Sequence, residues 1–319
     1  MTATVNFPSR EEILGAADRI RPYIHRTPVI TSETINRICG AELFFKCENL
    51  QKAGAFKVRG ATNAVMSLPG EDIKRGVATH SSGNHAAALS MAARNRGIRA
   101  YIVMPGNSSK VKIAAVQSYG GEITFCEPTL AAREETLNQV LAQTFATEIH
   151  PYNDLRIIAG QATAALELIE DAGNLDYIIT PVGGGGLLSG TALSASYFGK
   201  GIKVIAGEPS GADDAYQSFY KGELVPSVNP DTIADGLRTS LGSLTFPIIR
   251  KFVTDIHTVS DFNIAEAMKL VWERMKLIIE PSAATPLAAL LKNKTRYAGK
   301  RIGIILTGGN VDLNKLPWQ

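Results

Sequence analysis

Hydrophobic and polar positions alternate between two patterns along most of this chain. Short apolar runs, such as residues 77–80, 100–104 and 177–180, predict buried strands. Longer segments that repeat apolar residues every three or four positions predict helices, and glycine follows several of them. Strands and helices in regular alternation predict an α/β protein with open, mostly parallel, twisted sheets that are flanked by helices.

The predicted elements divide the chain into two lobes. The strands are expected at residues 43–48, 77–80, 100–104, 122–126, 148–150, 177–180, 203–207, 255–259 and 301–306. The helices are expected at residues 10–24, from a start within 52–60 to about 68, and at 83–96, 108–119, 129–145, 158–172, 186–198, 261–275 and 286–293, the first opened by a capping box of Ser9 and Glu12. The compact alternation over residues 76–151 predicts a small α/β domain inserted into a large domain of residues 1–75 and 152–319.

Composition and charge exclude several classes of protein. The 319 residues are 45% hydrophobic and 20% charged with a net charge of +3, so neither nucleic acid nor a membrane is an expected partner. Three cysteines without a C-x-x-C spacing indicate neither a disulfide framework nor a zinc site. The first residues lack the pattern of a signal peptide, and no apolar run approaches ~18 residues, so a cytoplasmic protein is expected.

Four consecutive glycines, residues 183–186, separate the predicted strand at 177–180 from the helix that follows it. Glycines between a strand and a helix allow backbone amides to point into one concavity at the helix N-terminus, where a phosphate binds well. A flexible linker is disfavoured because both flanks are apolar. A dinucleotide fold would place an acidic residue where Glu208 stands, but no G-x-G-x-x-G frame fits residues 183–190. A cofactor with one phosphate is therefore predicted.

Three further polar segments follow predicted strands. Lys57 lies in a loop of small residues, residues 79–85 form a polar turn, and residues 307–310 form another. A lysine shielded from solvent can lose part of its charge, as a Schiff-base lysine requires, although local sequence alone favours a solvated surface lysine. Because strand ends in open α/β sheets converge on one crevice, these turns and the glycines predict one site.

The sequence resembles the serine racemase and serine/threonine dehydratase family, which includes threo-3-hydroxyaspartate ammonia-lyases. These are pyridoxal-phosphate enzymes with the fold type of the tryptophan synthase β subunit. The longest matching segment is Glu-Asn-Leu-Gln-Lys-Ala-Gly-Ala-Phe-Lys-Val-Arg-Gly at residues 48–60. The others lie in order along the chain at residues 80–85, 159–161, 181–186, 208–214, 232–236, 272–276, 280–282 and 308–313.

Carried over by position, the resemblance implies a pyridoxal 5′-phosphate site. It makes Lys57 the lysine that binds the cofactor carbonyl and Phe56 a neighbour that packs on the ring. Asn84 is expected to bond the 3′ oxygen, and Thr307 to face the pyridine nitrogen. A neutral hydroxyl there does not stabilise a protonated ring, which favours elimination of a β-substituent. The phosphate is expected on the backbone amides of Gly183, Gly184, Gly185 and Gly186.

The resemblance also implies a substrate site. The loop expected to receive the substrate carboxylate comprises Ser81, Ser82, Gly83 and His85. Ser82 matches the residue that transfers a proton on the cofactor face opposite Lys57, as racemisation requires. Tyr152 stands where mammalian serine racemases carry an asparagine near the substrate, which argues against a preference for serine racemisation.

An acidic turn matches the divalent-cation site of the family. The expected ligands are the carboxylates of Glu208 and Asp214 with the carbonyl oxygen of Ala212. Oxygen ligands of this kind suit Mg²⁺, with Ca²⁺ or Mn²⁺ as alternatives. The alternative interpretation is a solvated acidic turn without a metal.

The activity implied is a pyridoxal-phosphate-dependent ammonia-lyase of L-serine, L-threonine or L-threo-3-hydroxyaspartate that forms a 2-oxo acid and ammonia. One alternative is a serine racemase with dehydratase side activity, and a minor one is a catalytically silent, ligand-binding relative. A homodimer is expected. Arg156 is a candidate to bind the distal carboxylate of 3-hydroxyaspartate, although a surface arginine is the simpler interpretation.

Overall fold

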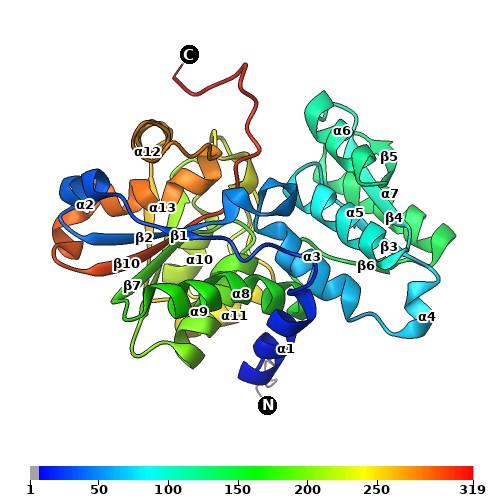
Figure 1. The fold of residues 1–319 in the computed structure, drawn as a ribbon. Helices are drawn as coiled ribbons and strands as arrows, with labels where there is room; N and C mark the ends of the chain where they lie inside the picture. Colours follow the sequence, from blue (N-terminus) through cyan, green and yellow to red (C-terminus); the bar gives the residue numbers. More distant parts are fainter. Residues whose placement is uncertain (1–6, 319) are drawn as a thin grey trace.

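A computed structural model describes residues 7–318, which form two sheets with helices around them (Figure 1). The larger sheet has the strand order β1-β2-β10-β7-β8-β9. Its neighbouring strands run parallel except for β1 and β2, which are antiparallel. The bounds are Val29–Ile30 for β1, Glu42–Cys47 for β2, Tyr177–Pro181 for β7, Lys203–Pro209 for β8, Asp255–Val259 for β9 and Arg301–Leu306 for β10.

The smaller sheet has the strand order β5-β4-β3-β6, and all its strands are parallel. Its strands are β3 (Val77–His80), β4 (Ala100–Pro105), β5 (Glu122–Cys126) and β6 (Thr147–Glu148). The helices around it are α5 (Asn84–Arg96), α6 (Lys110–Ser118) and α7 (Leu130–Thr144), which occupy one side of the molecule in Figure 1. This architecture confirms the predicted α/β class with parallel sheets flanked by helices.

Alternate residues of the larger sheet face opposite helical layers. Ile179 and Ile304 pack in one core with residues of α12 and α13, whereas Ile178 and Ile305 pack in another with residues of α8 and α9. This is the two-residue period expected of a strand buried on both faces. The helices of this part are α1 (Arg10–Ile20), α2 (Glu33–Cys39), α8 (Leu155–Ala172), α9 (Gly186–Phe198), α10 (Asp214–Lys221), α11 (Thr245–Phe252), α12 (Asp261–Met275) and α13 (Pro281–Lys292).

Helix α3 (Lys57–Met66) connects the two sheets, and the short α4 (Gly70–Ile73) follows it. Val58 and Val65 of α3 pack in the same core as Leu89 of α5 and Ile102 of β4. On another side α3 meets α8, where a Cβ on Gly160 would lie 2.6 Å from the Cα of Gly60. The helix is thus packed against both parts, and the domain boundaries at residues 75/76 and 151/152 stay a prediction.

Three predicted helix bounds are wrong by three residues or more, and proline explains two of them. Helix α8 begins at Leu155 instead of residue 158, directly after its N-cap Asp154. The first helix ends at Ile20 instead of residue 24, because Pro22 has no N–H with which to donate the next hydrogen bond of the helix. The last helix begins at Pro281, not at Pro286, which lies inside it. Pro281 occupies the first turn, where its missing N–H costs no hydrogen bond. The capping box of Ser9 and Glu12 is confirmed.

Several short elements were not predicted from the sequence, namely β1, α2, α4, α10 and α11. For α2 the local signals were present. Ser32 accepts a hydrogen bond from the amide of Ile35 at its start, and Gly40 ends it with φ +68°. Seven residues carry too little hydrophobic periodicity to distinguish such a helix from a loop.

Candidate active site

Lys57 begins helix α3, and the residue as a whole is partly exposed while its amine points into the protein. Its Nζ donates a hydrogen bond of 2.9 Å to the carbonyl oxygen of Pro151 and lies 5.2 Å from the centre of the Phe56 ring. Burial lowers the pKa of Lys57 to about 8, although the carboxylate of Glu280 opposes the shift. An amine in this state is neutral often enough near neutral pH to act as a base or nucleophile.

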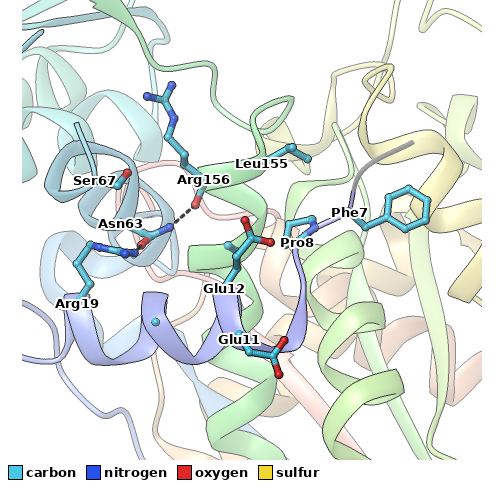
Figure 2. A pocket seen from close by; sticks show the side chains of 11 residues that line it. Phe7, Pro8, Glu11, Glu12, Arg19, Asn63, Ser67, Leu155 and Arg156 are labelled. Carbon is cyan, nitrogen blue, oxygen red and sulfur yellow. Dashed lines mark hydrogen bonds between the residues drawn. The ribbon is translucent and has the colours of Figure 1, made fainter. Parts of the chain in front are cut away.

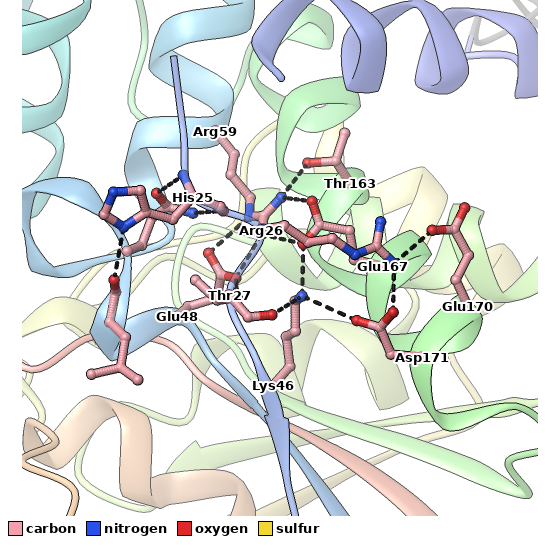
Figure 3. A network of polar contacts seen from close by, with 12 residues as sticks. His25, Arg26, Thr27, Lys46, Glu48, Arg59, Thr163, Glu167, Glu170 and Asp171 are labelled. Atoms are coloured by element: carbon pink, nitrogen blue, oxygen red, sulfur yellow. Dashed lines mark hydrogen bonds and ion pairs between the residues drawn. The ribbon is translucent and has the colours of Figure 1, made fainter. Parts of the chain in front are cut away.

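A buried ionic network holds the first turn of α3 (Figure 3). The guanidinium of Arg59 donates to both oxygens of Glu48 at 2.8 Å and to both oxygens of Glu167 at 2.7 and 2.8 Å. The amine of Lys46 pairs with the same Glu167 at 2.6 Å. Because Glu48 follows β2 and Glu167 lies on α8, the network fastens the helix that begins with Lys57 to two other elements.

The glycine loop lies fully buried between β7 and α9. Gly185 has φ +88°, a left-handed conformation that favours glycine. At Gly184 a Cβ would lie 2.3 Å from the Tyr152 ring, so no other residue fits there. Within residues 7–318 the amides of Gly183, Gly184 and Gly185 donate to no protein acceptor, and they precede the N-terminus of α9. This cradle fits the phosphate of the predicted cofactor.

Asn84 lies at the start of α5, and its side chain contacts Glu280 in the part of the molecule that contains the larger sheet. Its amide nitrogen donates to the two oxygens of Glu280 at 2.9 and 3.2 Å, and its oxygen accepts from Asn310 at 2.9 Å. Both partners fix the orientation of Asn84. Burial raises the pKa of Glu280 to about 7, and Asp235 adds to the shift.

Glu280 was missed as a site residue from the sequence. The only signal was its place in the matching segment at residues 280–282, which does not say where the side chain points. Its bonds to Asn84 join residues 196 positions apart in the chain.

Thr307 is buried directly after β10 and lies against the loop that carries Lys57. Its carbonyl oxygen accepts a 3.0 Å hydrogen bond from the amide of Phe56, and the amide of Glu280 donates to Gly308 at 3.0 Å. The turn after β10 and the loop before α3 are therefore brought together, as their order at the strand ends predicts.

The loop of Ser81, Ser82 and Gly83 follows the carboxyl end of β3. The amide of Ser81 donates to Val103 at 3.1 Å, and the amide of Gly83 donates to the Ser81 hydroxyl at 3.3 Å. Ser82 is half-buried between them. The His85 ring is buried, its Nε2 bonds the carbonyl oxygen of Ile149 at 3.1 Å, and its Nδ1 has no hydrogen-bond partner among the described residues.

Three histidines near Lys57 are held neutral. Burial lowers the pKa of His85 to about 3 and that of His150 to about 4, and it also lowers that of His80. Nδ1 of His150 accepts hydrogen bonds from the amides of Tyr152 and Asn153 at 3.3 and 2.9 Å. The Tyr152 ring packs edge-on against His150 at 4.5 Å, so this turn carries Tyr152 onto the glycine loop.

The acidic turn at the end of β8 contains two buried carboxylates. Glu208 accepts the amides of Ala215 and Tyr216 at 2.9 and 2.8 Å, and so holds the start of α10. Neither carboxylate oxygen of Asp214 has a hydrogen-bond partner of good geometry within residues 7–318, and the Ser227 hydroxyl and the Leu241 amide lie near enough to oppose part of the rise in its pKa that burial causes. Burial raises the pKa of Asp214 to about 6 and that of Glu208 further above its ordinary value. A buried carboxylate with free oxygens fits a cation ligand.

The pair does not belong to a larger cluster of metal ligands. Throughout the described chain, no group of three or more His, Cys, Asp or Glu side chains could hold a metal ion. A cation would therefore need the Ala212 carbonyl and water besides Glu208 and Asp214, which suits Mg²⁺ because this ion keeps several waters.

Arg156 does not supply the predicted carboxylate site. Its guanidinium pairs with the Asp154 carboxylate at 2.6 Å, at the start of α8. Figure 2 shows Arg156 beside a cavity of about 430 Å³ that α1, α3 and α8 border, together with Arg19 and Asn63. This cavity is separate from the Lys57 site.

Arg133 of α7 carries a charge that acts on the end of β3, directly before the substrate loop. Its charge is close enough to His80, the residue before Ser81, to add to the fall in the pKa of His80 that burial causes. In the described part of the chain no carboxylate pairs with Arg133, and its buried Nε has no hydrogen-bond partner. Local sequence offered no signal for it, because Arg133 stands among other charged residues of a helix.

The fold and this arrangement of a lysine, a glycine loop and an asparagine define the class of protein. The model of the pyridoxal-phosphate dependent enzyme family matches residues 20–308, and the chain belongs to this family. The resemblance drawn from the sequence motifs is confirmed. Pyridoxal phosphate is the cofactor that this family implies, and the free amides of the glycine loop fit it.

The relatives of this chain within the family are dehydratases and racemases. The chain is 52% identical to a beta-hydroxyaspartate dehydratase of Paracoccus denitrificans, over 98% of this chain and 99% of the relative. The serine racemase structure from Dictyostelium discoideum is 53% identical with a TM-score of 0.92, over 96% of this chain and 99% of that one. A threonine deaminase structure from T.th. is 40% identical with a TM-score of 0.91, over 96% and 99% of the chains. Among the described residues no helix has the length and apolarity to cross a membrane.

Proposed function

We propose that this protein is an ammonia-lyase that eliminates water from β-hydroxy amino acids and releases a 2-oxo acid and ammonia. The observation that carries the proposal is Lys57, whose amine bonds the carbonyl of Pro151, the residue before the Tyr152 that covers Gly184, and has its pKa lowered to about 8. The 52% identity to a beta-hydroxyaspartate dehydratase supports the same reaction type. Retention of Lys57 and Ser82 argues against a catalytically silent relative.

The residues that hold pyridoxal phosphate would be Lys57 at the carbonyl, Asn84 at the ring, Thr307 at the pyridine nitrogen and the glycine loop at the phosphate. When bound, this cofactor withdraws the electrons left behind when a proton leaves the α-carbon of an amino acid. Asn84 keeps its orientation because Glu280 and Asn310 hold its amide from two sides.

Lys57 takes the α-proton on the face where its amine lies. The Pro151 carbonyl accepts from Nζ at 2.9 Å and so orients the amine before substrate arrives. The β-hydroxyl group leaves with a proton as water. One water molecule then hydrolyses the released enamine, after it tautomerises to an imine, to a 2-oxo acid and ammonia. One water is lost and one is consumed, so the reaction balances.

The proposal is tested by supplying holoenzyme with L-serine, L-threonine, L-threo-3-hydroxyaspartate and D-serine, and by measuring both 2-oxo acid and the chirality of the remaining amino acid. We expect 2-oxo acid from the L-substrates. Formation of D-serine without 2-oxo acid would favour a racemase instead. Absence of every product would support the silent relative.

Among the three substrates, the site favours one with a second carboxylate. Arg133 carries a positive charge that acts on His80, the residue before Ser81, and it forms no ion pair among the described residues, although the charge of its neighbour Glu134 also acts on His80. A buried guanidinium nitrogen without a partner costs free energy unless a ligand supplies an acceptor. A carboxylate on the β-carbon is such an acceptor and binds a guanidinium through two parallel hydrogen bonds. We therefore propose L-threo-3-hydroxyaspartate as the preferred substrate.

We predict that Arg133→Gln lowers kcat/KM for 3-hydroxyaspartate by about 10- to 100-fold, since a hydrogen bond to a charged group contributes about 1.5–3 kcal/mol. The value for L-serine, which has no second carboxylate, should change little. Arg156→Gln is the matched control, because its guanidinium is already paired with Asp154. Parallel losses for both substrates in Arg133→Gln would remove the proposed role.

A racemase activity beside elimination is the second candidate, and Ser82 distinguishes the two reactions. Elimination needs one base, Lys57, whereas racemisation also needs a proton donor on the opposite face. We predict that Ser82→Ala keeps most of its 2-oxo acid production from L-substrates but loses D-serine formation by about 100-fold or more. Chiral chromatography measures the second quantity. Equal loss of both reactions would mean that Ser82 mainly positions the substrate carboxylate.

We also propose that Glu208, Asp214 and the Ala212 carbonyl hold Mg²⁺. EDTA should lower the melting temperature, and Mg²⁺ at about 100 times its Kd should restore about 2.7 kcal/mol of stability by binding the folded state alone. Asp214→Ala should lose this response. Asp213→Ala is the matched control, since the Asp213 carboxylate accepts from Gln217 at 2.7 Å and contributes charge, but no predicted ligand, to the pair. Identical responses in wild type and Asp214→Ala would mean that the acidic turn binds no metal.

A further inference from the structure

The last segment of the chain passes the candidate site and then packs against helix α12. Near its start, the Asn310 side chain donates a 2.9 Å hydrogen bond to the side-chain oxygen of Asn84. Near its end, the Trp318 ring packs edge-on against the Trp272 ring of α12, with 5.4 Å between the ring centres. The sequence contains two tryptophans, and both take part in this contact. The segment therefore connects a site residue to a ring contact outside the site.

Trp272 is also bonded to the backbone that carries Glu280. Its indole N–H donates a 3.0 Å hydrogen bond to the carbonyl oxygen of Ile279, the residue directly before Glu280. Ile279 is fully buried, and Glu280 is the N-cap of α13, so this stretch between α12 and α13 is not part of either helix. The amide of Glu280 donates to the carbonyl oxygen of Gly308 at 3.0 Å. Two hydrogen bonds, one from Trp272 and one to the turn after β10, therefore fix the backbone at Glu280.

These contacts converge on the side chain of Asn84. Its nitrogen donates to both oxygens of Glu280 at 2.9 and 3.2 Å, and its oxygen accepts from Asn310. An amide that is held at both ends presents a fixed face to a ligand. Trp272 bonds the backbone that carries one of these partners, and the segment that carries the other ends on the Trp272 ring. The two partners of Asn84 therefore depend on the same pair of rings.

We propose that Trp272 and Trp318 are positioning residues, which hold Glu280 and Asn310 in place and so orient Asn84, the residue expected at the cofactor ring. This inference rests on the proposed function. The physical reason is that a buried carbonyl oxygen without its donor costs free energy, so the backbone at Ile279 would shift to find another partner. A small misplacement of a positioning group is enough to weaken the binding that it supports.

Trp272→Phe removes the indole N–H but keeps an aromatic ring for Trp318 to pack on. Holoenzyme is dialysed against decreasing concentrations of pyridoxal phosphate, and the cofactor that stays bound is followed by its absorbance. We expect the dissociation constant to rise about three- to tenfold, the effect of losing one hydrogen bond. Trp318→Ala should act in the same direction, whereas Trp318→Phe, which keeps a ring, should stay close to wild type. An unchanged dissociation constant in either Trp272→Phe or Trp318→Ala would overturn the inference.

Leu270→Ala is the matched control, because Leu270 lies on the same helix and packs against the same core as Trp272. It should lower stability in urea but leave cofactor retention unchanged. Hydrogen exchange of residues 277–283, with and without the cofactor, should become faster in Trp272→Phe and Trp318→Ala but not in the control. If Leu270→Ala weakens cofactor binding as much as Trp272→Phe does, a general loss of packing explains the effect and the positioning role is wrong.

A double-mutant cycle shows whether the effect passes through Asn84. In an Asn84→Ala background, Trp272→Phe should add little to the loss of cofactor affinity, because the residue that it positions is gone. Equal losses in both backgrounds would contradict the proposed route. Failure of the proposed function is distinguishable. Wild-type protein that never binds pyridoxal phosphate refutes both statements, whereas an active wild-type holoenzyme with tryptophan variants that bind the cofactor equally well refutes only the positioning role.

Discussion

Lys57→Ala is expected to lose 2-oxo acid production from every L-substrate, and any racemase activity, by about 10⁴-fold or more. This is the upper end of what one positioned base contributes, and Lys57 is also the residue that would bind the cofactor carbonyl. The amine is oriented by the Pro151 carbonyl and has its pKa lowered to about 8, so neighbouring lysines cannot replace it.

Two measurements check this result. The first is the rate of 2-oxo acid formation, and the second is the absorbance near ~410 nm of a lysine bound to a carbonyl cofactor, which borohydride should bleach in wild type only. Lys52→Ala is the matched control, because Lys52 lies in the same short loop before α3. An unchanged band in Lys57→Ala would refute the role of Lys57 and with it the proposed function.

Arg59→Met is expected to destabilise the protein by about 3–5 kcal/mol, because it leaves the buried carboxylate of Glu48 without a cation and leaves Glu167 with Lys46 alone. Arg59 is fully buried, and its N–H groups are directed to Glu48, Glu167 and Thr163. Methionine fills a similar volume, so the loss reflects charge more than packing. Figure 3 shows why the substitution should also weaken neighbouring contacts. Lys46 bonds Glu167 and Thr27 bonds Glu48, the two carboxylates that Arg59 bonds.

Urea unfolding of the cofactor-free protein measures this loss without interference from ligand binding. Arg37→Met is the control, since Arg37 pairs with Glu33 at 2.8 Å on an exposed face of α2 and should contribute little. If Arg59→Met loses no more stability than Arg37→Met, the network does not hold α3 in place. A variant too unstable to purify would agree with the prediction, and Glu167→Gln, which keeps an acceptor for Arg59, should then give a smaller and measurable loss.

The parts of the site that could be predicted are those that depend on local pattern. Lys57, Asn84, the glycine loop and Thr307 all lie at the carboxyl ends of strands that short apolar runs predict, and the structure has those strands at or near the predicted positions. Parallel strands bring their carboxyl ends to one edge, so neighbouring turns could be expected to meet there. The roles of these residues stay predictions that the proposed experiments test.

The sequence could not decide whether Arg133 or Arg156 is the candidate to bind a substrate carboxylate. Arg156 has the more suggestive position in the sequence, close to Tyr152, but Asp154 at the start of α8 neutralises it. Arg133 lies in an ordinary amphipathic helix, and only the packing of α7 against the smaller sheet brings it near His80. Charge in a sequence says nothing about which charges remain unpaired after folding.

The sequence alone determined the α/β class, most strands and the long helices, together with the family and its motifs. These features follow from strand and helix periods and glycine turns, which are local properties of the chain. Tertiary structure alone decided that Glu280 orients Asn84, that Tyr152 covers Gly184, and that Arg59 joins Glu48 to Glu167. Most of these contacts link residues far apart in the chain. Their geometry depends on how whole helices and strands pack, which no local pattern encodes.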